Sequence, residues 1–157
     1  MNIRHLILCF VIGMTALVTS CDPARVFDET VAIEGPGWHR DSVFHYHVEV
    51  VDTLQLHNFF ISMRNNTDYP YSNIYIFLTT TFPNGHSTTD TIECILAGRD
   101  GHWLGNGSGR IKDNLIMLQP NLRFPIAGDY HFSLEQAMRD TVLVGIEDVG
   151  LRIERAR

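Results

Sequence analysis

The segment Val43–Val51 reads VFHYHVEVV, and its alternation points to the fold class. Aromatic or aliphatic side chains occupy every second position from Phe44, and two histidines and a glutamate stand between them. A period of two is typical of a β-strand with one face in a core and the other in water. The segment therefore predicts a half-buried strand.

The same period recurs along the rest of the chain. The final run changes phase in its middle, and a β-bulge near Glu147-Asp148 would reconcile its two halves. One run is apolar on both faces, which indicates a central strand. Gly, Pro, Asn and Asp clusters separate the runs, as expected of turns. The predicted strands cover 43–51, 57–64, 74–82 (the run that is apolar on both faces), 91–97, 122–126, 130–134 and 142–153.

About eight strands at this spacing predict an all-β protein, an antiparallel β-sandwich of the jelly-roll or immunoglobulin type. One short helix is expected over Ser133–Arg139, because Ser133 and Gln136 have the spacing of a capping box. A helical crossover before a long last strand favours the jelly roll.

The first twenty residues have the order of a bacterial lipoprotein signal. Arg4 supplies a positive charge, an uncharged apolar run follows, and Val18-Thr19-Ser20-Cys21 forms a lipobox. The apolar run is shorter than the roughly 20 residues of a membrane span. We expect a signal peptide at 1–20, a lipidated amino terminus and tether at 21–30, and a β-sandwich domain at 31–157. Cys21 is the predicted lipidation site, where acyl chains such as palmitate would be attached.

Composition excludes some classes of protein. The chain has 12 basic and 18 acidic residues and a single lysine, Lys112, so no basic stripe is available for nucleic acid. Of its three cysteines, Cys9 lies in the signal and Cys21 in the lipobox, which leaves Cys94 without a disulfide partner. Apolar neighbours predict that Cys94 is a buried strand thiol rather than a nucleophile.

Two sets of side chains could bind a ligand. The aromatic residues Trp38, Tyr69, Tyr71 and Trp103 could stack on sugar rings, or they could fill the core. His45, His47 and Glu49 share one strand face and could hold a metal, although alternation alone also predicts such a polar face. The glycine-rich segment 105–109 lacks the context of a phosphate loop and predicts a tight turn. No motif indicates an enzyme, a cofactor or a bound metal.

Motifs along nearly the whole chain resemble the gliding motility-associated lipoprotein GldH family of Bacteroidetes. The resemblance implies a non-enzymatic lipoprotein of the cell envelope, linked to gliding and type IX protein secretion, in the outer membrane and with other envelope or secretion proteins as partners. Cys21, as the lipidation site, is the only functional residue that the resemblance implies. Among its motifs are Ser20-Cys21-Asp22, Val26–Glu29, Met63-Arg64-Asn65, Tyr69–Phe77, Gly101–Gly107, Phe132–Arg139 and Gly145–Ile153. A carbohydrate-binding module on the same fold, and a metal-dependent enzyme or sensor, are the alternatives.

Overall fold

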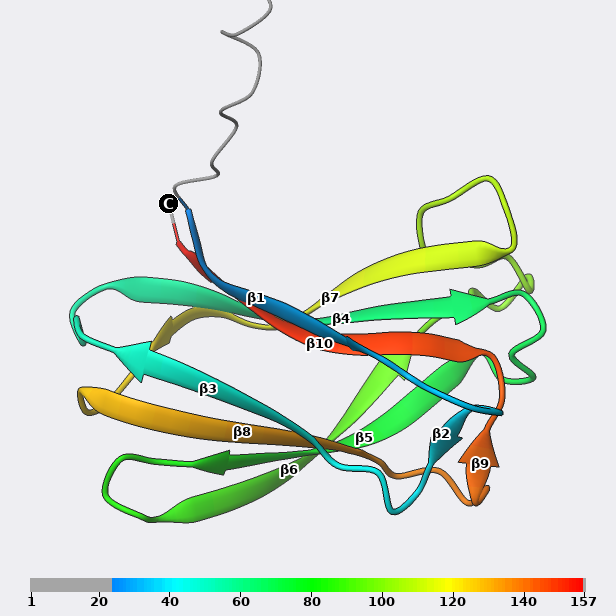
Figure 1. Cartoon of the computed structure of the whole chain (residues 1–157). Coiled ribbons are helices and arrows are strands. Elements are labelled where there is room, and N and C mark those ends of the chain that lie inside the picture. The colour runs from blue at the N-terminus through cyan, green and yellow to red at the C-terminus, as the bar shows by residue number, and fades with distance from the viewer. Residues whose placement is uncertain (1–23, 157) are drawn as a thin grey trace, which may run out of the picture.

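The computed structural model describes residues 24–156, which form ten β-strands and no helix (Figure 1). None of these residues belongs to a helix able to cross a membrane. The strands are β1 (Arg25–Ala32), β2 (Trp38–His39), β3 (Phe44–Val50), β4 (Leu56–Asn66), β5 (Asn73–Thr81), β6 (Ser87–Ile95), β7 (Ile111–Arg123), β8 (Gly128–Gln136), β9 (Val142–Leu143) and β10 (Ile146–Arg155).

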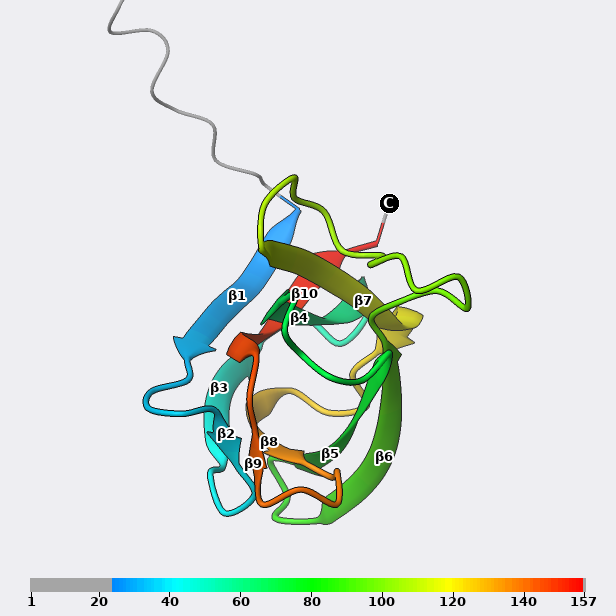
Figure 2. The same ribbon diagram turned by 90° about the vertical axis from the view of Figure 1, so that its right-hand side faces the viewer.

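Eight of the strands form two antiparallel sheets that pack face to face (Figure 2). The first sheet has the order β1-β10-β4-β7, and the second has the order β3-β8-β5-β6. The short strands β2 and β9 form a separate two-stranded sheet.

The strand pairs nest inside one another along the sequence. β5 pairs with β6, β4 with β7, β3 with β8, β2 with β9 and β1 with β10. The chain is thus one long two-stranded ribbon whose tip is the 82–86 turn. Rolling the ribbon up adds the β10–β4 and β5–β8 pairs. This is the arrangement of a jelly roll, so the predicted all-β jelly-roll sandwich is confirmed.

The core lies between the two sheets and is built from the inward-facing residues of alternating segments such as 43–51. Tyr46 and Val48 of β3 point inward and are buried, whereas His45 and His47 point outward. The Tyr46 hydroxyl donates a hydrogen bond of 2.9 Å to the carbonyl of Val149 on β10, which ties the second sheet to the first. Each fully buried aliphatic side chain of such a core contributes about 1.5–3 kcal/mol relative to exposure.

The predicted helix over Ser133–Arg139 is wrong. Residues 128–136 form β8, which pairs with β3 on one side and β5 on the other. Gln136 caps a bend instead of a helix: its side chain donates to the carbonyl of Asp140 and accepts from the amide of Met138. Pairing with two neighbouring strands therefore overrides the local capping signal.

The bulge predicted near Glu147-Asp148 is present. The register between β10 and β4 shifts between Ile146 and Asp148. The predicted last strand is nevertheless divided into β9 and β10. Gly145 separates them with φ 92°, and a Cβ there would lie 2.9 Å from the backbone of Tyr69.

Two edge strands extend beyond the sequence prediction. β1 begins at Arg25, so residues 25–30, expected within the tether, belong to the first sheet. β7 covers 111–123, where only the end was expected. Most residues of both strands are exposed, and their hydrophobic alternation is correspondingly weak.

Candidate functional site

Different loops form the two ends of the sandwich. The near end, where β1 begins, comprises residues 24–26, the loops 51–55, 82–86 and 124–127, and residues 155–156 (Figure 1). Both described termini lie there, and the amide of Arg155 donates to the carbonyl of Ala24 at 2.7 Å. The far end comprises the loops 33–37, 67–72, 96–110 and 137–145. Cys21 lies outside the described residues, three positions before Ala24.

The four aromatic candidates gather at the far end, but two of them are buried. Trp38 is 0% exposed, and its indole nitrogen donates to the carbonyl of Ser42 at 3.1 Å. Tyr69 is 3% exposed and donates to the carbonyl of Asn73 at 3.0 Å. Both rings pack in the core with satisfied polar atoms, so neither can stack on a sugar.

Tyr71 and Trp103 remain partly accessible. Tyr71 is 38% exposed, and its hydroxyl donates a hydrogen bond of 2.6 Å to the carboxylate of Asp140. That bond raises the pKa of Tyr71, because it stabilises the protonated phenol. Trp103 is half-buried and packs against the core. The structure thus brings the four residues to one end without making an aromatic platform of them.

The polar face of β3 carries His45, His47 and Glu49 as predicted. His47 lies directly opposite His131 of β8, and their rings meet edge to face with centroids 4.4 Å apart. His131 was missed, although it stands between inward residues in a predicted strand. Within residues 24–156 no group of three or more His, Cys, Asp and Glu residues is placed to hold a metal ion.

Cys94 and Lys112 have structural positions. Cys94 is fully buried on the inner side of β6, and burial, with a smaller effect of Glu93, raises the pKa of its thiol to about 12. A thiol with that pKa is an unreactive core residue. The Lys112 amino group donates to the carbonyl of Gly107, which closes the glycine-rich turn instead of presenting a cation to a phosphate.

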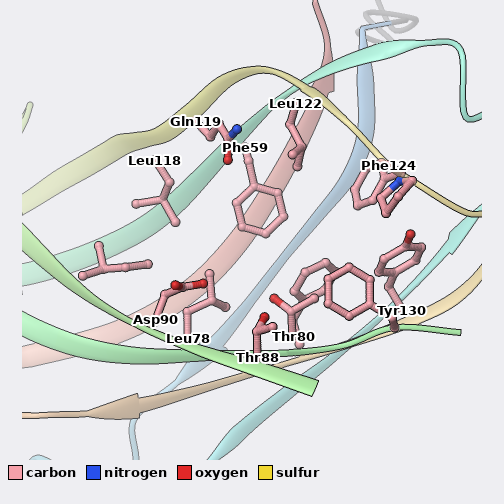
Figure 3. Close-up of a pocket in the computed structure, with 14 residues that line it drawn as sticks. Phe59, Leu78, Thr80, Thr88, Asp90, Leu118, Gln119, Leu122, Phe124 and Tyr130 are labelled. Atoms are coloured by element: carbon pink, nitrogen blue, oxygen red, sulfur yellow. The ribbon is translucent and has the colours of Figure 1, made fainter. Parts of the chain in front are cut away.

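A cavity between the sheets was not foreseen. It lies where β6 and β7 leave the sandwich edge unpaired, has a volume of about 380 Å³, and is walled mainly by rings and aliphatic side chains (Figure 3). The Asp90 carboxylate and Thr88 hydroxyl of β6 are part of its lining. No pattern along the chain indicates this cavity, because its walls come from five strands and two loops. The cavity could accommodate an apolar group beside a carboxylate.

Comparison with known proteins identifies the family of this chain. A family model described as GldH lipoprotein matches residues 25–153, from the first residue of β1 almost to the end of β10. The chain belongs to the GldH lipoprotein family. The resemblance stated from the sequence motifs is thereby confirmed, and the protein is a membrane-anchored lipoprotein of the cell envelope.

Two curated relatives extend over nearly the whole chain. The gliding motility lipoprotein GldH homolog of Christiangramia forsetii is 37% identical over 147 residues, which cover 89% of this chain and 90% of the relative. The gliding motility lipoprotein GldH of Flavobacterium johnsoniae is 36% identical over 146 residues, 88% of this chain and 90% of the relative.

Among solved structures, dimeric latent PorU from Porphyromonas gingivalis overlaps with a TM-score of 0.35 at 9% identity. The overlap covers 88% of this chain and 14% of PorU.

Proposed function

We propose that this GldH-family protein is a lipid-anchored accessory or scaffold component of the machinery for gliding motility and type IX protein secretion. The observation that carries the proposal is the family match over nearly the whole sandwich, joined to the lipobox at Val18–Cys21. We assign the protein to the outer membrane, with envelope or secretion proteins as partners.

Anchoring is assigned to Cys21. A single acyl chain binds membranes only marginally, and further chains add about 0.8 kcal/mol per buried CH2. A diacylglycerol on the thiol together with acylation of the new amino terminus would therefore hold the domain firmly at the membrane.

A role without catalysis agrees with where the reactive side chains lie. Cys94 is buried with a raised pKa, Lys112 closes a turn, and the His47–His131 pair stands on an open sheet face without a third ligand among the described residues. The alternative of a carbohydrate-binding module is less well supported, because Trp38 and Tyr69 are inside the core and cannot contact a sugar.

The test is deletion of the gene in the source organism, followed by complementation and by photo-crosslinking. We expect reduced amounts of secreted proteins in the medium, and loss of colony spreading if the organism glides. A photo-reactive residue in place of exposed Tyr71 or Phe77 should capture an envelope or secretion protein. Normal secretion and spreading in the deletion strain, without any captured envelope protein, would contradict the proposal.

A further inference from the structure

The two most exposed large hydrophobic side chains of the described residues lie together at the near end of the sandwich. Val51 is 80% exposed, Leu54 is 77% exposed and Val26 is 41% exposed. Val26 and Val51 line the same hollow, of about 360 Å³, so β1 and the 51–55 loop are neighbours there. Leaving such side chains in water is unfavourable relative to burying them. An aliphatic cluster at one end of a domain often marks an interaction surface.

The loop holds Leu54 outward in a fixed turn. The carboxylate of Asp52 accepts a hydrogen bond of 2.8 Å from the amide of Leu54, as in an Asx-turn. β3 ends at buried Val50 and β4 begins at Leu56, so the five residues between them have little freedom to fold the aliphatic side chains inward. The apolar tip is therefore built into the connection.

The length of the chain before the sandwich fixes what can face this end. Only three residue steps separate Cys21 from Ala24, and at about 3.6 Å each they span at most about 11 Å. A folded partner domain of 100 residues has a radius of gyration of about 13 Å and would not fit within that gap. A lipidated Cys21 thus keeps the near end next to the bilayer.

We propose that the near end docks directly on the lipid bilayer, with Val51 and Leu54 inserted at the boundary between headgroups and acyl chains and Val26 at the rim of the contact. The inference rests on the proposed lipid anchor at Cys21 and adds a defined orientation to it. The anchor supplies a high local concentration of lipid, so a small apolar contact suffices.

Charge at the near end favours an apolar contact rather than attraction to anionic lipids. Arg25, Arg123 and Arg155 lie there, but so do the carboxylates of Glu49, Asp52 and Asp129. Arg25 also forms an ion pair with Asp28 at 3.0 Å. With no excess of positive charge, docking should occur on neutral phosphatidylcholine and should be insensitive to salt.

Orientation follows from the length of the strands. β4 has eleven residues, which at about 3.3 Å each carry the far end roughly 35 Å from the near end. The docked domain would therefore hold Tyr71 and Trp103 away from the membrane.

The experiment uses the full-length lipoprotein, purified from membranes and reconstituted in phosphatidylcholine vesicles with brominated acyl chains, which quench nearby indoles. Leu54→Trp places an indole at the near end. Val144→Trp, at a residue 56% exposed at the far end, is the matched control. The native Trp38 and Trp103 also lie at the far end and provide an unquenched background.

We expect the added emission of Leu54→Trp to fall by about a factor of two with brominated lipid, at low and at high salt, and that of Val144→Trp to be unchanged. Val51→Trp should behave as Leu54→Trp. Equal quenching at both ends, or none at positions 51 and 54 while the protein stays with the vesicles, would overturn the docking proposal alone. A wild-type protein that does not remain with the vesicles would overturn the anchor and the docking together.

Discussion

The carboxylate of Asp148 on β10 is paired with the guanidinium of Arg64 on β4, across the outer face of the first sheet. Asp148 is 2% exposed, whereas the Arg64 side chain is half exposed. The bulge at Glu147 puts Asp148 opposite Arg64 in the ladder. A buried carboxylate without its cation is strongly unfavourable, so this pair should matter more than an ordinary surface ion pair.

Replacing Arg64 should destabilise the fold through Asp148. We expect Arg64→Ala to lower the free energy of unfolding by about 1–3 kcal/mol, because a buried charge loses its hydrogen-bonded partner. Urea unfolding of the detergent-solubilised protein measures this. The double variant Arg64→Ala/Asp148→Asn should be less destabilised than the sum of the single changes. Purely additive effects would show that the two side chains are not coupled.

The contribution of the Tyr46 hydroxyl, which joins the two sheets, to stability can be measured by comparing Tyr46→Phe with Tyr71→Phe. Tyr46→Phe removes the buried hydrogen bond to Val149 and should lower the free energy of unfolding by about 1 kcal/mol. Tyr71→Phe removes an exposed hydroxyl bonded to Asp140 and should change it by less than about 0.5 kcal/mol. The same urea measurement compares them, and equal effects would argue against a special role of the inter-sheet bond.

His57 should make stability depend on pH. Its Nδ1 atom is buried without a hydrogen-bond partner in the described structure, and burial, with a smaller effect of Arg155, lowers its pKa from 6.5. Below pH 6.5 the unfolded chain binds a proton that the native imidazole resists, so the free energy of unfolding falls as pH decreases from about 6.5 towards the native pKa. His57→Phe, which keeps the ring contact with Phe124, should flatten this dependence. An unchanged pH slope in the variant would contradict the assignment.

Much of the core could be predicted from the sequence, because alternation reports directly which side chains point inward. β3, β4 and β5 obey that pattern and were found within about two residues, the usual uncertainty of element ends. β1 and most of β7 escaped prediction, since most of their residues are exposed and their sequences show little hydrophobic alternation. The helix at Ser133–Arg139 failed because a capping signal is local, whereas pairing of β8 with two strands is not.

The candidate site was harder to predict for a related reason. Sequence identifies Trp38 and Tyr69 as aromatic, but only packing against loops distant in the chain decides that they are buried. The meeting of Val26 with Val51, and of His47 with His131, likewise depends on strand pairing across long sequence separations.

Cys94 provides a chemical test of the core. In the proposed mature lipoprotein, with Cys21 acylated and Cys9 removed with the signal, Cys94 would be the sole free thiol. With a pKa raised to about 12 and no exposure, it should resist a maleimide reagent in the folded protein at neutral pH and react fully in denaturant. Rapid labelling under native conditions, read by mass spectrometry, would contradict the packing of β6.

Attachment of this GldH-family sandwich to the membrane through Cys21 can be measured by the mass of its amino-terminal peptide. We expect that protein extracted from membranes begins at Cys21 with acyl chains on that residue, and that Cys21→Ala protein moves to the soluble fraction. An unmodified amino-terminal peptide, or Cys21→Ala protein that remains fully with the membranes, would contradict it.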